Sequence, residues 1–182
     1  VGYQQSLAIT EPAALLDIEL PQPVATGRDL LVKVAAISVN PVDTKVRKRA
    51  APPAGEYKVL GWDAAGEVVA VGPEVSNFKV GDRVVNTFMP RWVGGAFQAS
   101  ARDELYGSDR DGWLTEYKVV SEESLLSLPD YLNFEQGATL PCAAVTAWAA
   151  LSGDRPVKAG ETVLTLGSGG VSLFAIQLAK AM

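Results

Sequence analysis

The first 130 residues form short β-type segments separated by turn signals, and this pattern constrains the fold most. Residues 29–39 and 66–71 are rich in Val, Ile and Ala, and turns containing Gly or Pro bound both segments. A tight turn at Gly81-Asp82 leads into a further apolar segment, and residues 114–120 alternate in part. The pattern predicts an antiparallel β domain, either a sandwich or a barrel.

After residue 130 the pattern becomes helical. Asn133 is a candidate N-cap with Gln136 three residues later, which predicts a capping box. Two helical pieces follow, divided at Leu140-Pro141, and the second spans residues 142–151. A strand at 162–166, a glycine turn and a helix close the chain. We therefore expect two regions: residues 1–130, and residues 131–182.

Charge argues against nucleic acid as a partner. The 182 residues carry 16 Lys and Arg against 21 Asp and Glu, for a net charge of −5, whereas phosphate-binding surfaces need clustered positive charge. One short basic run (Lys45, Arg47, Lys48 and Arg49) predicts a solvated helix face or, alternatively, an anionic ligand contact at a cleft mouth. No apolar segment approaches the roughly 18 residues of a membrane span, and no signal-peptide pattern opens the chain. We expect a cytoplasmic protein.

The chain has no histidine and only one cysteine, Cys142. An internal disulfide, Ser-His-Asp or Cys-His catalysis and a His-containing zinc site are therefore excluded within this chain. Any chemistry must come from a cofactor, from hydroxyls and carboxylates, or from bound water.

The glycine turn between the expected last strand and helix is typical of a dinucleotide-binding unit. It comprises Gly167, Ser168, Gly169, Gly170, Val171 and Ser172. Glycines permit close approach of a pyrophosphate to free N–H groups at the helix N-terminus, and Ser172 stands where the third glycine of the motif would pack helix on strand. A glycine-rich turn without a ligand is the alternative. The acidic residue that would distinguish NAD from NADP falls beyond Met182, so both cofactors stay open.

Several motifs in fixed order resemble those of one family. They are residues 36–44 (AISVNPVDT), 61–68 (GWDAAGEV), 78–84 (FKVGDRV), 140–148 (LPCAAVTAW) and the glycine turn. Together they resemble the medium-chain dehydrogenase/reductase superfamily, in its zinc-free, quinone oxidoreductase-like and alcohol dehydrogenase-like branch. The resemblance implies a mainly β, GroES-like barrel followed by a helical segment and an incomplete Rossmann β-α unit. The intact Rossmann domain would bind NAD or NADP, and we expect this binding to be impaired in residues 1–182.

The resemblance also implies roles for individual residues. Asn40, Trp62 and Cys142 occupy the zinc-ligand positions of the metal-dependent members, and only a thiolate among them binds zinc well, so no catalytic zinc is expected. Asn40 and Thr44 would line the nicotinamide end. Asn40-Pro41 is alternatively an ordinary turn, and Cys142 a small buried apolar residue.

Four further roles follow from the same resemblance. Thr146 would pack against the nicotinamide, or alternatively bond back to the preceding helical turn. Gly167, Ser168, Gly169, Gly170 and Val171 would contact the pyrophosphate. Tyr57 is a candidate proton donor, and water is the alternative. Asp63 is expected to be a structural hydrogen-bonding acid rather than a general base.

The intact enzyme would transfer hydride between NAD(P)H and a quinone, an enone or another carbonyl, or oxidise an alcohol. We expect weak or no activity from residues 1–182 alone, because the cofactor domain is incomplete. The alternative is a non-catalytic binding or assembly module that forms a homodimer, or joins a complementing Rossmann fragment, through its C-terminal β-α arm. Residues 91–112 are expected to form either a loop beside the cleft or a surface excursion.

Overall fold

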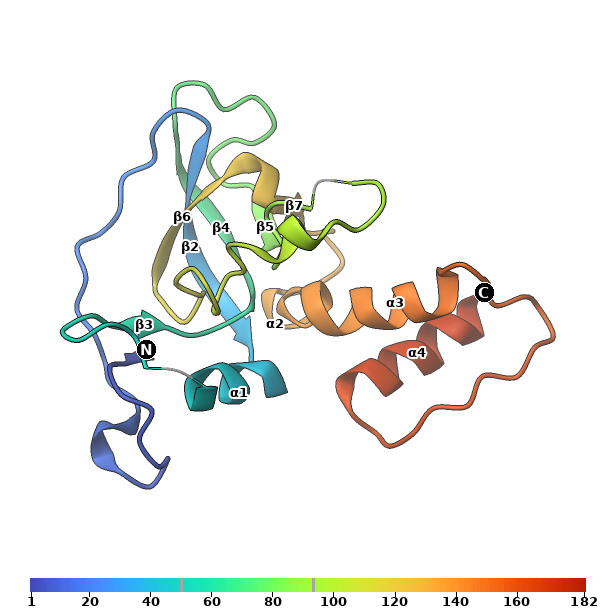
Figure 1. Ribbon diagram of the computed structural model, residues 1–182. Coiled ribbons are helices and arrows are strands. Elements are labelled where there is room, and N and C mark those ends of the chain that lie inside the picture. Colours follow the sequence, from blue (N-terminus) through green and yellow to red (C-terminus); the bar gives the residue numbers. More distant parts are fainter. Residues whose placement is uncertain (50, 93) are drawn as a thin grey trace.

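The computed structural model describes residues 1–49, 51–92 and 94–182, and its centre is a five-stranded antiparallel sheet (Figure 1). The strand order is β6-β2-β4-β5-β7. The strands are β2 (Asp29–Ser38), β4 (Asp63–Val71), β5 (Arg83–Asn86), β6 (Tyr117–Ser121) and β7 (Leu125–Ser127). A second, two-stranded sheet pairs β1 (Gly2–Tyr3) with β3 (Lys58–Val59). The predicted mainly β architecture with C-terminal helices is confirmed.

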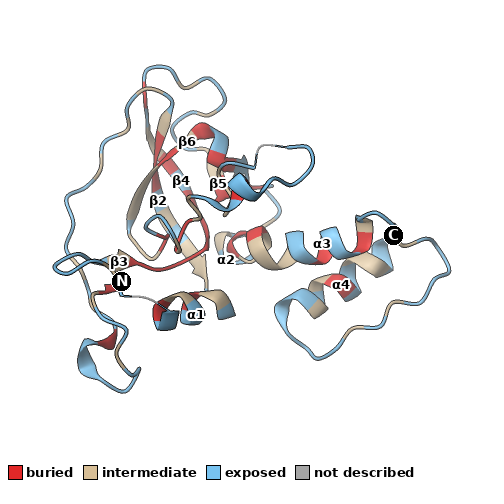
Figure 2. Cartoon of the chain, in the orientation of Figure 1, coloured by how far each residue is buried: buried red, intermediate tan, exposed pale blue. Residues whose placement is uncertain are grey.

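The main core lies against the central strands. Leu30 and Val32 of β2, Val68 of β4 and Val84 of β5 are almost fully buried, together with Trp113 of the connection before β6. Figure 2 shows the same concentration of buried residues along the sheet. Because apolar side chains removed from water stabilise a fold in proportion to their area, this cluster holds the β region together.

Within the described ranges, four α-helices accompany the sheet, with one π-helical turn between the second and third. They are α1 (Pro41–Arg49), α2 (Phe134–Ala138), α3 (Val145–Ser152) and α4 (Gly170–Ala181), and the π segment is η4 (Leu140–Ala144). Short 3-10 turns occupy η1 (Pro12–Ala14), η2 (Ala99–Arg102) and η3 (Glu122–Ser124). No helix of the described residues is long and apolar enough to cross a membrane.

The start of α2 confirms the predicted capping box. Asn133 Oδ1 accepts from Gln136 N at 2.7 Å, and Gln136 Oε1 accepts from Asn133 N at 3.0 Å. The expected break at Leu140-Pro141 is the π turn η4, where Pro141 has no N–H to continue an α-helical ladder. Ala138 of α2 packs with Ala65 of β4 and Leu128, which seats the helix on the sheet.

The strand expected at residues 162–166 is not formed. This segment has no regular secondary structure and pairs with no described strand. Leu164 and Leu166 are exposed, while Val163 packs against the cluster formed by α3 and α4. A strand exists only through hydrogen bonds to a neighbour, and no described residue offers one here. The segment is apolar, as a strand requires, but a strand also needs a neighbouring strand to pair with.

The basic run is only partly the solvated face that its composition predicts. Lys45, Lys48 and Arg49 are exposed, but Arg47 is buried and its Nη1 donates to the carbonyl oxygen of Leu7 at 2.8 Å. Arg47 therefore ties α1 to the N-terminal segment rather than facing solvent or an anionic ligand.

Residues 91–112, of which Val93 lies outside the described residues, are anchored on the segment before β4. Gly112 N donates to Val59 O at 2.8 Å, and the following Trp113 N donates to Gly61 O at 3.0 Å. Gly61 has a φ of 103° and passes close beneath this connection, where any side chain would meet the backbone of Leu114. The C-terminal end of the 91–112 loop is thus hydrogen-bonded to residues 59–61, which lead into Asp63.

Candidate functional site

Asp63, at the first position of β4, is the centre of the candidate site. Its side chain is fully buried, and Oδ2 accepts hydrogen bonds from Asn40 Nδ2 at 2.9 Å and from Cys142 N at 3.1 Å. These bonds join three segments: the connection from β2 to α1, the start of β4, and the π turn η4. Asp63 Oδ1 is buried and has no hydrogen-bond partner among the described residues. The expectation of a structural hydrogen-bonding acid agrees with these contacts.

Asn40 is held through both its backbone and its side chain. Its N–H donates to Asp43 Oδ2 at 2.7 Å, and Asp43 N donates back to Asn40 O at 3.0 Å. The side-chain Nδ2 also donates to Ser38 O at 3.3 Å. Asn40 directly precedes α1, which begins at Pro41, so it belongs to a helix start rather than to an ordinary turn, and its side-chain amide bonds to Asp63.

Burial shifts the pKa values of Asp63, Asp43 and the neighbouring thiol of Cys142. Burial raises the pKa of Asp63 from 3.8 to about 6, against the opposing hydrogen bonds from Asn40 and Cys142. Burial also raises the pKa of Asp43 above its ordinary value. The pKa of the Cys142 thiol is raised to about 11 by burial and by the negative charge of Asp63 and Asp43. At neutral pH, Cys142 is a neutral thiol.

Asn86, which sequence reasoning missed, supports both neighbours of Asp63. Its Oδ1 accepts from Ala64 N at 2.7 Å and its Nδ2 donates to Trp62 O at 2.8 Å. The Trp62 ring stacks on Phe88 with centroids 5.4 Å apart. A polar residue closing the apolar strand β5 was the available signal, because a buried amide needs polar partners.

The glycine turn adjoins this cluster. Gly170, the first residue of α4, lies against the π turn, since a Cβ added there would approach Ala143 Cβ to 3.5 Å. Gly167 has a φ of 78°, and a Cβ at Gly167 or Gly169 would point into open space. The α4 N-terminus has no side-chain cap, so its N–H groups stay available. The turn therefore fits the pyrophosphate of a dinucleotide, which needs close backbone approach and free N–H donors.

The remaining members of the turn are also accessible. Ser168 and Val171 are exposed, and Ser172 Oγ donates to Leu166 O at 3.0 Å. The serine at the third glycine position thus closes the turn onto the preceding segment. The pyrophosphate contacts assigned to these residues stay a prediction.

The two threonines lie one helical turn after Asn40 and Cys142. Thr44 Oγ1 donates to Pro41 O at 2.9 Å, and Thr146 Oγ1 donates to Cys142 O at 2.7 Å. Both residues are exposed. Thr146 therefore makes the bond to the preceding turn that was its alternative role, and the cofactor contacts of both hydroxyls stay a prediction.

In the part of the chain that the structure describes, no hydrogen bond joins Tyr57 to the network of Asn40, Asp63 and Cys142. It precedes β3 and is 44% exposed. Its role as a proton donor stays a prediction. Among the described residues, no three His, Cys, Asp or Glu side chains are grouped as a metal site requires.

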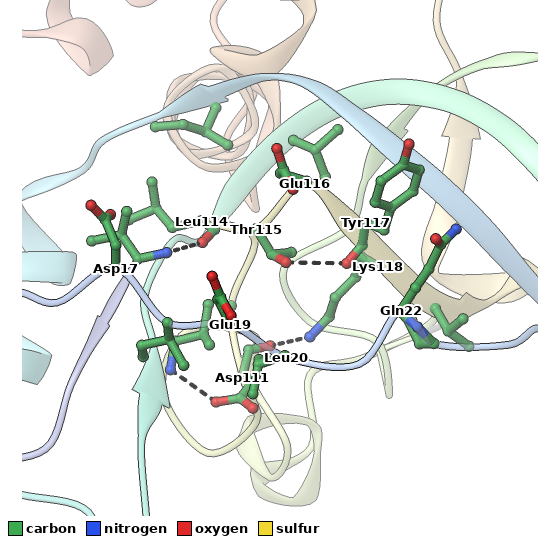
Figure 3. Close-up of a pocket in the computed structure, with 18 of the residues that line it drawn as sticks. Asp17, Glu19, Leu20, Gln22, Asp111, Leu114, Thr115, Glu116, Tyr117 and Lys118 are labelled. Atoms are coloured by element: carbon green, nitrogen blue, oxygen red, sulfur yellow. Dashed lines mark hydrogen bonds between the residues drawn. The ribbon is translucent and has the colours of Figure 1, made fainter.

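A separate pocket of about 1060 Å³ contains none of the predicted site residues (Figure 3). It lies between residues 17–23, the second half of β2 and residues 111–119. Lys118 Nζ donates to Asp111 O at 2.7 Å there, and burial lowers the pKa of this lysine to about 8. The candidate site is therefore defined by the hydrogen-bond network around Asp63, rather than by this pocket.

Comparison with known proteins bears on this arrangement. The alcohol dehydrogenase GroES-like domain matches residues 26–130. The chain is 41% identical over 168 residues to a zinc-type alcohol dehydrogenase-like protein of Schizosaccharomyces pombe, covering 91% of this chain and 48% of that protein. It is 37% identical over 163 residues to a quinone oxidoreductase of Pseudomonas aeruginosa, covering 88% and 44%.

A solved structure shows the same relation in three dimensions. It is the crystal structure of a proposed alcohol dehydrogenase of Sinorhizobium meliloti, with 35% identity, a TM-score of 0.84, and coverage of 99% of this chain and 53% of that one. The chain thus spans about half the length of the relatives it matches. With residues 26–130 accounting for more than half of its length, the chain belongs to the medium-chain dehydrogenase/reductase superfamily and contains the alcohol dehydrogenase GroES-like domain.

Proposed function

We propose that this chain forms the substrate-facing part of an NAD(P)-dependent oxidoreductase that transfers hydride between nicotinamide and a quinone, an enone or another carbonyl, or an alcohol in reverse. The convergence of Asn40 and Cys142 on Asp63 supports this most directly, because it joins the β region to the helical segment that leads to the glycine turn. Family membership supports the reaction class. The activity concerns the whole protein, of which this chain covers about half by comparison with its relatives.

The nicotinamide group, when bound, supplies the hydride chemistry. The residues of this chain would bind the cofactor and orient it toward the substrate. Gly167, Ser168, Gly169, Gly170 and Val171 would hold the pyrophosphate through backbone N–H groups of the turn. Asn40 and Thr146, near opposite ends of the Asp63 network, would face the nicotinamide end. Thr44 would stand beside Asn40. Either Tyr57 or water would supply the proton to the reduced product.

We propose that this chemistry does not use zinc. Of the positions that hold zinc in metal-dependent members, Asn40 and Trp62 provide no thiolate or imidazole. The third, Cys142, has its pKa raised to about 11, so displacing its proton would cost extra free energy. Support comes from this donor chemistry, and the zinc-type name of one relative makes a direct metal analysis worthwhile.

Cofactor titration tests the proposal. The purified chain is titrated with NADPH and with NADH while tryptophan fluorescence and thermal stability are followed. Binding tighter than about 100 μM supports the enzyme reading, since affinities in that range are ordinary for cofactors. Gly169→Val should weaken binding at least tenfold without lowering the melting temperature, because its side chain enters open space at the turn. No binding up to millimolar cofactor would contradict the proposal for this chain.

Exposed apolar side chains favour a second candidate, an assembly module that forms a homodimer or joins a complementing Rossmann fragment. Leu164 and Leu166 are 84% and 86% exposed, and Leu173 and Ile176 of α4 are about half exposed. Large contiguous apolar surface is typical of an interface. Light scattering of the wild-type chain and of the Ile176→Lys variant tests this second candidate. A wild-type dimer that the variant abolishes would support the assembly module. Monomers of both proteins would contradict it.

A further inference from the structure

The amide of Asn40 has its donor side occupied by the protein. Nδ2 donates to Asp63 Oδ2 at 2.9 Å and to Ser38 O at 3.3 Å. A carboxylate and a backbone carbonyl can only accept hydrogen bonds, so both partners require the NH₂ group, rather than the oxygen, of the Asn40 amide to face them. Asn40 Oδ1 receives no hydrogen bond from any described residue and is not among the buried unpartnered atoms. The carbonyl oxygen is therefore the side of the amide that meets solvent.

This orientation departs from what the local sequence favours. An asparagine directly before a helix normally turns its oxygen to the free N–H groups of the first turn. Asn133 before α2 does so. Asn40, directly before α1, instead donates from its side-chain Nδ2 to Asp63 Oδ2. The carboxylate of Asp43 accepts a hydrogen bond from the Asn40 backbone N–H. Local preference is overridden here by a buried acceptor, as commonly happens at functional sites.

Asp63 can fix the orientation of the Asn40 amide because its own side chain is held in place. It is fully buried, and its Oδ2 also accepts from the backbone N–H of Cys142, which is fixed in the π turn. The same oxygen takes both bonds. An amide at position 63 would therefore keep the acceptor, whereas a methyl group would remove it.

We infer that Asn40 meets its ligand as a hydrogen-bond acceptor only, and that the substrate group opposite it is a hydroxyl rather than a bare carbonyl oxygen. The inference rests on the proposed function for the identity of the ligand. Asp63 is the positioning residue, since it touches Asn40 and not the ligand. A ketone oxygen facing Asn40 Oδ1 would place two acceptors together, whereas an alcohol would donate to it.

The first test measures the amide itself, by hydrogen exchange of side-chain NH₂ groups in nuclear magnetic resonance spectra. Asn40 NH₂ should exchange on the order of tenfold more slowly than the NH₂ of exposed Asn133, whose oxygen is the bonded atom. Asn40→Ala assigns the signal. Asp63→Asn should keep the slow exchange and Asp63→Ala should lose it. Exchange of Asn40 as fast as that of Asn133 in the wild-type chain would overturn the inference.

The second test uses cyclohexanol and cyclohexanone as matched probes, titrated in the absence of cofactor so that the ketone is not reduced to the alcohol during the measurement. The wild-type chain and Asp63→Asn should bind the alcohol about fivefold more tightly than the ketone, the worth of one hydrogen bond. Asn40→Ala should bring the ratio near one. A ratio unchanged by Asn40→Ala, or a preference for the ketone, would overturn the inference. If neither probe binds, the proposed substrate site fails, and amide exchange still decides how Asn40 is oriented.

Discussion

The backbone N–H of Cys142 donates a hydrogen bond of 3.1 Å to the carboxylate of Asp63, although 79 positions separate the two residues in the sequence. The bond fastens the π turn η4 to the first residue of β4. It places a buried carboxylate beside a buried thiol, and the ionisation of both groups is altered as a result.

Asp63 should make stability fall as pH rises from about 4 to about 6. Its pKa is raised from 3.8 to about 6, so the folded chain binds more protons than the unfolded chain in this window. The contribution is present below the unfolded value and lost above the folded value, up to about 3 kcal/mol. Urea unfolding across this pH range should show a shallower fall in Asp63→Asn. Equal slopes in both proteins would contradict the pKa assignment.

Cys142 should react slowly with alkylating agents. Burial and two nearby carboxylates raise its pKa to about 11, and only the thiolate is nucleophilic. At pH 8 the folded chain should react with iodoacetamide on the order of a hundredfold more slowly than the same chain in urea, followed by intact mass. Comparable rates in the two states would show that the thiol is not perturbed.

Arg47 should contribute to stability while its neighbour Lys48 should not. Arg47 is buried and donates to Leu7 O, whereas Lys48 is exposed on the same helix. Arg47→Ala should lower the free energy of unfolding by about 1 to 3 kcal/mol, through lost packing of its stem and an unpaired carbonyl. Lys48→Ala is the matched control and should stay within about 0.5 kcal/mol. Equal changes in the free energy of unfolding for the two variants would contradict a stabilising role for Arg47 and would favour a solvated face for the whole basic run.

Asn86 should be costly to replace, although it would contact no ligand. Its amide satisfies Ala64 N and Trp62 O in the buried interior. Asn86→Ala should lower the free energy of unfolding by about 2 to 5 kcal/mol, because two backbone groups lose their partners. Asn86→Asp should retain the bond from Ala64 N and lose the one to Trp62 O. Chemical denaturation that finds Asn86→Ala as stable as wild type would contradict this role.

Prediction from the sequence worked where the determinants were local. The capping box of Asn133 and Gln136, the break at Pro141 and the strands expected at residues 29–39 and 66–71 all depend on neighbouring residues. The domain division at residue 130, the coenzyme, the cytoplasmic location and the roles of Thr44, Tyr57 and Thr146 stay predictions. The strand at 162–166 was wrong because a strand also needs a neighbour.

By itself, the sequence determined the strands near residues 29–39 and 66–71, the capping box of α2, the glycine turn with its α4 helix, and the absence of histidine from this chain, since these follow from residue types and short spacings. Only the tertiary structure decided that Asp63 joins Asn40 to Cys142, that Arg47 is buried and that Asn86 supports the site. Those outcomes depend on hydrogen bonds between segments 22 to 79 positions apart, and a buried polar group takes whichever partner the fold brings to it.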